Sequence, residues 1–221
     1  MGWRASALSL LALASLGAKV LQTRSVEVAM IHRVRTQVLS SFDESAGENL
    51  PGTLVCDEDE IMEKRLVTGV AYSRDEAKIT LVKVPDRPGV AAAIFSPLAD
   101  AGINVDMIVQ NVSDDGKTTD MTFTTGKADF DRAIKVLGDN AKAIGQERLS
   151  TDQNVVKVSV IGVGMRTHAG VAQTMFKTLA EKGINIQVIS TSEIKISVLI
   201  AAEYTELAIR TLHTAYELDA G

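Results

Sequence analysis

The sequence contains little cysteine, histidine or aromatic character. Its 221 residues include one cysteine, Cys56, and three histidines, and aromatic residues make up 4% of the chain. A single cysteine excludes a disulfide framework within the chain and, with so few histidines, leaves no ligand set for a metal cluster. This cysteine usage is typical of the reducing cytoplasm, which is the location we predict.

The chain also lacks an excess of positive charge and a long apolar run. Its net charge of −5 provides no basic surface for nucleic acid, so no nucleic-acid partner is expected. The apolar stretch 7–14 follows Arg4 and ends with small residues at positions 12 and 14. It fits a secretory signal or a buried helix, and it is too short to span a membrane.

Recognisable catalytic motifs are missing as well. The sequence has no glycine-rich phosphate loop with lysine, no Ser/His/acid set and no two-His-plus-acid spacing. Gly162, Gly164 and Gly170 imitate a dinucleotide fingerprint, but their spacing is wrong for one. Without a phosphate loop the chain has no cradle for the phosphate charge that phosphoryl transfer needs. Since the other motifs are missing too, we expect the isolated chain to be inactive and to hold no cofactor or metal.

What the sequence does contain is an internal repeat. Adding 81 to the positions 89–104 gives 170–185, and nine of these sixteen positions are identical. Each copy begins at a glycine, Gly89 or Gly170, and ends at an asparagine, Asn104 or Asn185. A repeat at this spacing indicates two copies of one small domain.

Each copy has the pattern of a ferredoxin-like βαββαβ unit, which gives an α/β (α+β) fold class. Strands are predicted at 79–84, 105–112 and 118–125 in the first copy and at 156–161, 186–190 and 194–200 in the second. The repeated segments supply one helix each, and 128–137 and 204–216 supply the other two. Pro97 lies in the first of these helices and should bend it or split it.

Counting the strands predicts that one unit is inserted in the other. The first copy has a fourth strand at Ile144–Leu149, whereas the second copy reaches the end of the sequence without one. The unassigned strand Leu66–Tyr72 can fill that place and so remove an exposed edge. We therefore predict a first, inserted domain at 77–150 and a second domain formed by 65–76 plus 151–221.

The remaining segment, 1–64, has too little chain for a core of its own. A helix is expected from Thr23 or Ser25, with Ser25 as a possible N-cap, followed by a strand at 35–40 and a loop at 41–52. Cys56 next to the acidic run 57–60 has no basic neighbour to lower its pKa, so it should be inert.

The turn after the first strand of the inserted domain is a candidate binding site. Proline and glycine in Asp86-Arg-Pro88-Gly89 favour a helix start that a ligand can approach closely. Free N–H groups at Gly89, Val90 and Ala91 would suit a carboxylate, and Asp86 an ammonium group, as a free amino acid requires. The alternative is that Asp86 only caps the helix. The second turn, 165–170, lacks the aspartate and the proline, so His168 should face solvent or a subunit contact.

Several motifs resemble aspartate kinases. Leu16-Gly-Ala-Lys-Val-Leu-Gln-Thr-Arg-Ser-Val-Glu27 and Pro51-Gly-Thr-Leu54 resemble the end of the amino-acid kinase domain, so 1–64 is interpreted as a kinase-domain remnant and linker. Asp86-Arg-Pro-Gly89, Asn104-Val-Asp-Met-Ile-Val-Gln-Asn-Val-Ser113 and Ile189-Ser-Thr-Ser-Glu-Ile194 resemble the tandem ACT regulatory domains. The whole is similar to the regulatory β subunits of α₂β₂ aspartokinases. This resemblance favours a buried helix over a secretory signal at 7–14.

The resemblance implies a function and a set of effector-binding residues. Threonine and lysine would bind as allosteric effectors and inhibit the phosphorylation of L-aspartate in lysine, threonine and methionine biosynthesis. The effector pocket would add Gln110, Asn111, Ser113, Asp120 and Thr122 to the turn. Ser190, Thr191, Ser192 and Glu193 would border the ACT interface or serve only as turn residues.

The resemblance also implies partners. The chain would form a homodimer through its ACT domains and bind a catalytic α subunit, which would carry ATP and Mg²⁺. Two alternatives are a free-standing ACT amino-acid sensor, which would have no use for a kinase remnant, and an RNA-binding module. The second would need several exposed aromatics on its central strands, where the sequence offers only Phe123.

Overall fold

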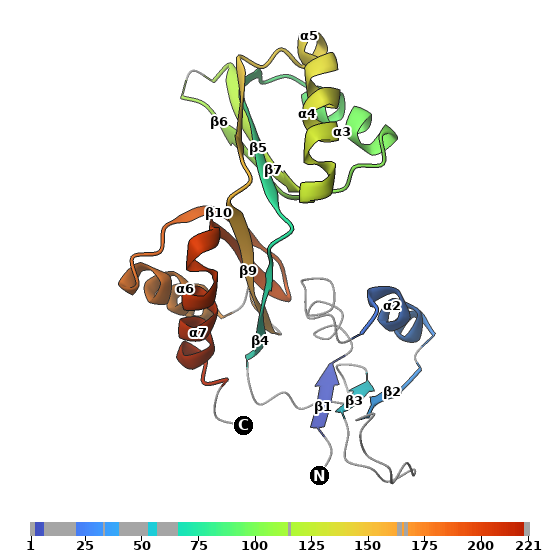
Figure 1. The fold of residues 1–221 in the computed structure, drawn as a ribbon, viewed down its shortest axis with the longest axis vertical. Coiled ribbons are helices and arrows are strands. Elements are labelled where there is room, and N and C mark those ends of the chain that lie inside the picture. The colour runs from blue at the N-terminus through green and yellow to red at the C-terminus, as the bar shows by residue number, and fades with distance from the viewer. Residues whose placement is uncertain are drawn as a thin grey trace.

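The computed structural model describes residues 3–6, 21–32, 34–39, 53–56, 66–114, 116–162, 165 and 168–218. Figure 1 shows two α/β units and a smaller N-terminal group that contains strands β1 to β3 and helix α2. In each unit a 3₁₀ turn leads from a strand into the second helix. These turns are Lys127–Asp129 in the first unit and Ala202–Tyr204 in the second. The helices and strands are β1 (Trp3–Ser6), α2 (Thr23–Ile31), β2 (Thr36–Val38), β3 (Thr53–Cys56), β4 (Val67–Ser73), β5 (Ala77–Pro85), α3 (Val90–Asp100), β6 (Val105–Val112), β7 (Thr118–Thr125), α4 (Phe130–Asp139), α5 (Ala141–Ile144), β8 (Arg148–Asp152), β9 (Val155–Gly162), α6 (Ala169–Glu181), β10 (Ile186–Thr191), β11 (Lys195–Ala201) and α7 (Thr205–Ala215).

The first unit, β5 to β8, is an antiparallel sheet in the order β6-β7-β5-β8. Its helices α3 and α4 lie against one face, as Figure 1 shows. Because side chains alternate along a strand, Ile79 and Leu81 of β5 enter the core while Thr80 points to the opposite face. Phe123 of β7 fills the centre of this core and meets the ring of Phe95 edge to face, with ring centroids 5.3 Å apart.

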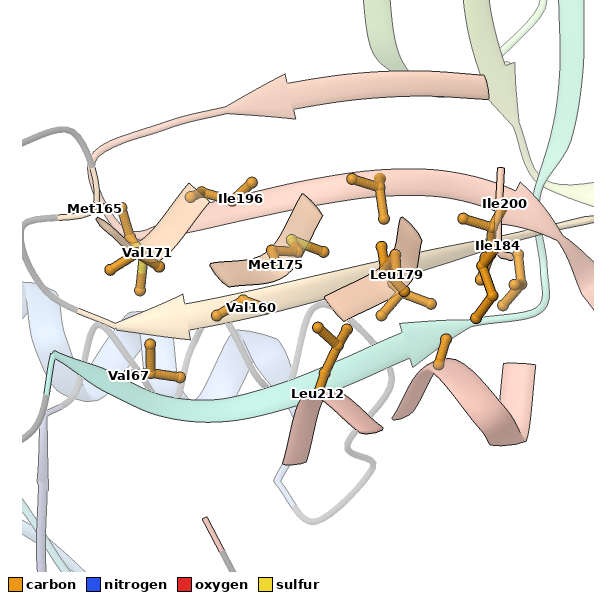
Figure 2. Packing of buried hydrophobic residues seen from close by; sticks show 14 residues of the cluster. Val67, Val160, Met165, Val171, Met175, Leu179, Ile184, Ile196, Ile200 and Leu212 are labelled. Carbon is orange, nitrogen blue, oxygen red and sulfur yellow. The ribbon is translucent and has the colours of Figure 1, made fainter. Parts of the chain in front are cut away.

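The second unit, β4 with β9 to α7, is an antiparallel sheet in the order β10-β11-β9-β4. Figure 2 shows its core, in which Met175 and Leu179 of α6 and Leu212 of α7 pack against the sheet. Strand β9 is buried along its whole length, as expected for a central strand with a continuous β-branched run. The Tyr216 hydroxyl ties the end of α7 to α6 by donating to the Val171 carbonyl oxygen at 2.7 Å.

The strand pairing confirms the order predicted from strand counting. β4 pairs antiparallel with β9 and closes the second sheet, although the whole first unit lies between them in the sequence. The chain therefore begins the second sheet, leaves it to build the first unit, and returns. Two connections link the units, one at residues 74–76 and the other at 153–154.

Three local predictions need correction. The predicted fourth strand is present but lies later than 144–149: Ile144 ends the short helix α5, and the strand runs from Arg148 to Asp152. Helix α2 starts at Thr23 with Gln22 as N-cap, so Ser25 lies inside its first turn and does not cap it. Helix α3 runs through Pro97 as one helix, so of the two predicted outcomes the split is excluded and the bend stays a prediction.

At the N-terminus, β3 pairs with β1 in parallel and with β2 in antiparallel orientation. Strands β1 and β3 were not predicted, because four-residue strands carry too short a pattern to identify. The apolar stretch 7–14 and the loop at 41–52 lie outside the described residues. Helix α2 buries Val26 but leaves Val28 and Ile31 exposed on another side.

The two units meet through a small apolar cluster. Met107 and Val109 of β6 pack against Val155, Val188 and Leu199 of the second unit. The edge strands β6 and β10 contact each other here, and Figure 1 shows the first unit stacked on one end of the second, where the two connections pass between them.

Candidate functional site

The first predicted binding turn follows directly from the end of β5. Pro85 lies opposite Thr118 of β7, and the Asp86 N–H donates to the Lys117 carbonyl oxygen at 2.8 Å. Gly89 then adopts φ +89° at the N-cap of α3, a left-handed conformation that glycine reaches without strain. No side chain caps the helix, so the alternative role of Asp86 as an N-cap is not observed.

This turn is open to solvent. The residues 86–89 and Ala91 are exposed, whereas Val90 is buried and anchors α3 to the core. A Cβ on Gly89 would have no heavy atom within 4 Å, so the space above the turn is free for another molecule. The prediction of three free N–H groups fails at Val90, whose N–H donates to the Arg87 carbonyl oxygen at 3.2 Å.

The loop between β6 and β7 lies beside the turn. Asp86 is joined to this loop by its hydrogen bond to Lys117, and Ser113 closes the loop by donating its N–H to Thr118 at 2.9 Å. Gln110 and Asn111 are exposed on the edge strand β6 that leads into the loop. The structure therefore brings Asp86 and Ser113 to the same end of the sheet.

Asp120 and Thr122 lie on the sheet face opposite α3. They alternate with Met121 and Phe123, which enter the core. Thr122 shares a 2.9 Å hydrogen bond with the Thr80 hydroxyl, and Asp120 accepts the Lys83 N–H at 2.8 Å. Both side chains thus already have partners within the sheet, on a different face from the helix start.

We expect Asp120→Ala to destabilise the first unit even without any ligand. Lys83 has φ +52° at an irregularity in the β5–β7 pairing, and the Asp120 carboxylate satisfies its N–H. Losing a charge-assisted hydrogen bond of this kind costs about 1 to 2 kcal/mol. Urea unfolding of the free protein measures the change, and unchanged stability would contradict a structural role.

Ser190–Glu193 belong to the second unit. Here the loop between β10 and β11 is closed by Ser192, whose N–H donates to the Lys195 carbonyl oxygen at 2.8 Å and whose hydroxyl accepts the Lys195 N–H at 3.2 Å. Met165 of the second turn donates its N–H to the Glu193 carbonyl oxygen at 3.0 Å. The predicted residues thus fall into two groups, one in each repeat, and the two groups lie at equivalent ends of the repeats. The hydrogen bonds of Ser192 show that it acts as a turn residue, which was one of its two predicted roles.

A groove beside the second turn was not predicted from the sequence. It has a volume of about 490 Å³ and is lined mainly by apolar groups from β4, α6 and the end of α7, namely Leu66, Val67, His168, Gly170, Val171, Thr174 and Tyr216. Burial raises the pKa of Tyr216, so its hydroxyl stays protonated and keeps its bond to Val171. His168 is exposed, as predicted.

Within the described ranges, no three His, Cys, Asp or Glu side chains are grouped so that they could hold a metal ion. The helices of that same part of the chain are all too short or too polar to cross a membrane.

Comparison with known proteins identifies both repeats. Residues 78–141 and 158–216 each match models of the ACT domain. The regulatory subunit of aspartate kinase from Thermus thermophilus, solved in a ligand-free form, is 42% identical, with a TM-score of 0.65. The match covers 99% of that subunit and 68% of this chain. The chain belongs to the aspartokinase family.

Two further relatives show which part of an aspartokinase the chain resembles. A solved structure of aspartokinase α and β subunits is 50% identical, with a TM-score of 0.64, and the match covers 99% of that chain and 68% of this one. The aspartate kinase of Pseudomonas fluorescens (strain SBW25) is 54% identical over 212 residues, which are 96% of this chain and 50% of that enzyme. The chain therefore spans about half the length of this curated relative and contains the tandem ACT region of the aspartokinase family.

Proposed function

We propose that this chain regulates an aspartokinase by binding threonine and lysine, the feedback inhibitors of L-aspartate phosphorylation by ATP in the biosynthesis of lysine, threonine and methionine. The likeness to solved regulatory subunits over both ACT units carries this proposal. The chain itself would hold no cofactor, and ATP and Mg²⁺ would bind to the catalytic subunit. The working location would be the cytoplasm.

The exposed turn at Asp86–Ala91 supports an amino-acid site in the first unit. The start of α3 has no side-chain cap, so its dipole and its first N–H groups, apart from the Val90 N–H that is bonded to Arg87, are available to a carboxylate. Asp86 is exposed beside it and can accept an ammonium group. Ser113 and the amides of Gln110 and Asn111 can add hydrogen bonds from the neighbouring strand and loop. A site built to bond the threonine hydroxyl would reject analogues that lack it.

The test is calorimetric titration of the whole chain with L-threonine and L-lysine, each alone and with the other present. We expect saturable threonine binding that Asp86→Ala weakens at least about tenfold, because one charged hydrogen bond is worth about 1.5 to 3 kcal/mol. Asn111→Ala should weaken it as well.

The matched control is Asp100→Ala. Asp100 is an exposed carboxylate at the opposite end of α3, so removing it changes the net charge equally without touching the turn. Equal weakening by both aspartate variants would contradict a site at Asp86. If circular dichroism shows that the sample is folded and neither amino acid gives a heat of binding, threonine and lysine are not its effectors.

A catalytic α subunit is the proposed partner, and helix α2 supports it. Val26 is 4% exposed, whereas Val28 is 48% and Ile31 76% exposed on other sides of the helix. A short helix with apolar residues on more than one side is typical of a helix covered from more than one side. We infer that 1–64 is a kinase-domain remnant and that its outer apolar surface meets the catalytic chain.

The first unit is the proposed dimer contact. Strand β6 is an edge of its sheet and exposes Ile108 and Val112, at 51% and 53%. An edge strand with apolar side chains favours pairing with a second copy. A homodimer through the ACT units would add a sheet edge or loop to each effector site.

A further inference from the structure

The contact between the two ACT units contains a buried lysine. Lys157 of β9 points from the open face of the second sheet, and its side chain is 8% exposed. It lies three residues after the connection 153–154 and opposite Ser73, which ends β4 just before the other connection. Lys157 is therefore placed beside both points where the chain passes between the units.

Two carboxylates from outside the second sheet bind this lysine. The Lys157 ammonium donates to Asp106 Oδ2 of β6 at 2.8 Å and lies 2.5 Å from Glu76 Oε1. Glu76 belongs to the connection 74–76 and its side chain is 7% exposed, whereas the Asp106 side chain is 51% exposed. The three charges thus join the second sheet, the first sheet and one connection.

The charges depend on one another because Lys157 and Glu76 are almost completely buried. Burial alone would lower the pKa of Lys157, but its hydrogen bonds to Asp106 and Glu76 outweigh that effect and raise it. Burial likewise would raise the pKa of Asp106, but the bond to Lys157 lowers it. Removing the lysine would leave the Glu76 carboxylate buried without its counter-charge, which is strongly unfavourable.

Among the described residues, a polar contact and a small apolar cluster also join the units. The Lys78 ammonium of β5 donates to Gln187 Oε1 of β10, and the apolar cluster consists of Met107, Val155, Val188 and Leu199 with Val109 at its margin. None of these residues is aromatic, and Lys78 and Gln187 are partly exposed. A small apolar contact tolerates sliding, whereas a charge held by two hydrogen-bonded carboxylates fixes one geometry.

We propose that Lys157, Glu76 and Asp106 form an ionic latch that holds the two ACT units in this one relative placement. Opening the latch would let the first unit rotate about the connections 74–76 and 153–154. Any ligand that favours a different placement of the units must then overcome the latch, so its strength sets how readily the chain responds. The latch would act in the free chain, whichever effector binds.

The test measures the distance between the units directly. Spin labels at Ser96→Cys of α3 and Gln173→Cys of α6, both exposed positions, report on one unit each when Cys56 is replaced by serine. We expect one narrow distance distribution in the otherwise native chain. Lys157→Met and Asp106→Asn should broaden it and raise the population of other placements at least about tenfold, because the first removes both charge-assisted hydrogen bonds and the second removes the negative charge of one partner.

The matched control is Glu206→Gln. Glu206 forms an ion pair with Arg74, at the same connection, but Arg74 and Glu206 are 59% and 81% exposed and no first-unit residue takes part in the pair. The distance distribution should therefore stay narrow. If Lys157→Met unfolds the second unit, Asp106→Asn still tests the latch, since Asp106 is half exposed. An unchanged distribution in a folded Asp106→Asn chain, or equal broadening in Glu206→Gln, would overturn the proposal.

Discussion

Gly162→Ala is expected to lower the free energy of unfolding of the second ACT unit by at least about 3 kcal/mol, at the upper end of the cost of overpacking a core. A Cβ at this position would lie 1.8 Å from the Leu66 carbonyl oxygen and 2.8 Å from its carbonyl carbon. These are backbone atoms of the residue just before β4, so making room for the Cβ requires the beginning of β4 to shift away from the end of β9. The Met165 Cε atom, 2.5 Å away, is the end of a flexible side chain and can shift.

Urea unfolding followed by circular dichroism gives the measurement, and Gly138→Ala is its control. Gly138 lies inside α4 and is exposed, and a Cβ added to it would have no heavy atom within 4 Å. Because alanine is the better helix former, that variant should gain about 0.5 to 1 kcal/mol. If both alanine variants changed stability in the same direction, the close approach of Leu66 to Gly162 would not be what requires glycine there.

The requirement for glycine at 162 illustrates what the sequence alone does not reveal. Gly162 first suggested part of an imperfect dinucleotide motif, whereas the structure gives it a packing role between two strands that are distant in the sequence. Gly89 was predicted correctly as a turn glycine, because its conformation is set by its immediate neighbours. The backbone conformation of a turn is determined by neighbouring residues and can be predicted from them. A close approach between segments that are distant in the sequence cannot be predicted in this way.

The fold was more predictable than the site for the same reason. The repeat, the strand periodicity and the missing closing strand together led to two ferredoxin-like units and to the pairing of β4 with β9. The alternation along β7 could have shown that Asp120 and Thr122 leave the sheet on the face away from α3. The irregularity at Lys83, which gives Asp120 its backbone partner, has no sequence signal beyond the strand itself.

The contact between the units could not be predicted from the sequence either. Lys157 and Glu76 lie 81 positions apart, the same offset as the repeat, yet neither belongs to the repeated segment. In a strand-like run such as Val155–Gly162, a lone lysine suggests an exposed side chain. Only the folded arrangement shows that it is buried between two carboxylates.

Phe123→Ala should destabilise the first ACT unit by about 3 to 5 kcal/mol while leaving the second unit largely folded. The Phe123 ring is fully buried and packs edge to face on Phe95, so truncation removes a large apolar contact and leaves a cavity. The buried residues of the two units form separate clusters, and the contact between the units is small. The loss should therefore stay mostly within one unit.

Amide hydrogen exchange distinguishes the units, and Met175→Ala provides the reciprocal variant. Met175 is fully buried in the core of the second unit, where its loss should cost about 2 to 5 kcal/mol. Phe123→Ala should speed exchange in β5 and β7, and Met175→Ala in β9 and β11. If either variant sped exchange equally in both sheets, the two ACT units would unfold as one cooperative body. A ligand at the Asp86 turn would then be coupled to the second unit through global stability rather than through the placement of the units.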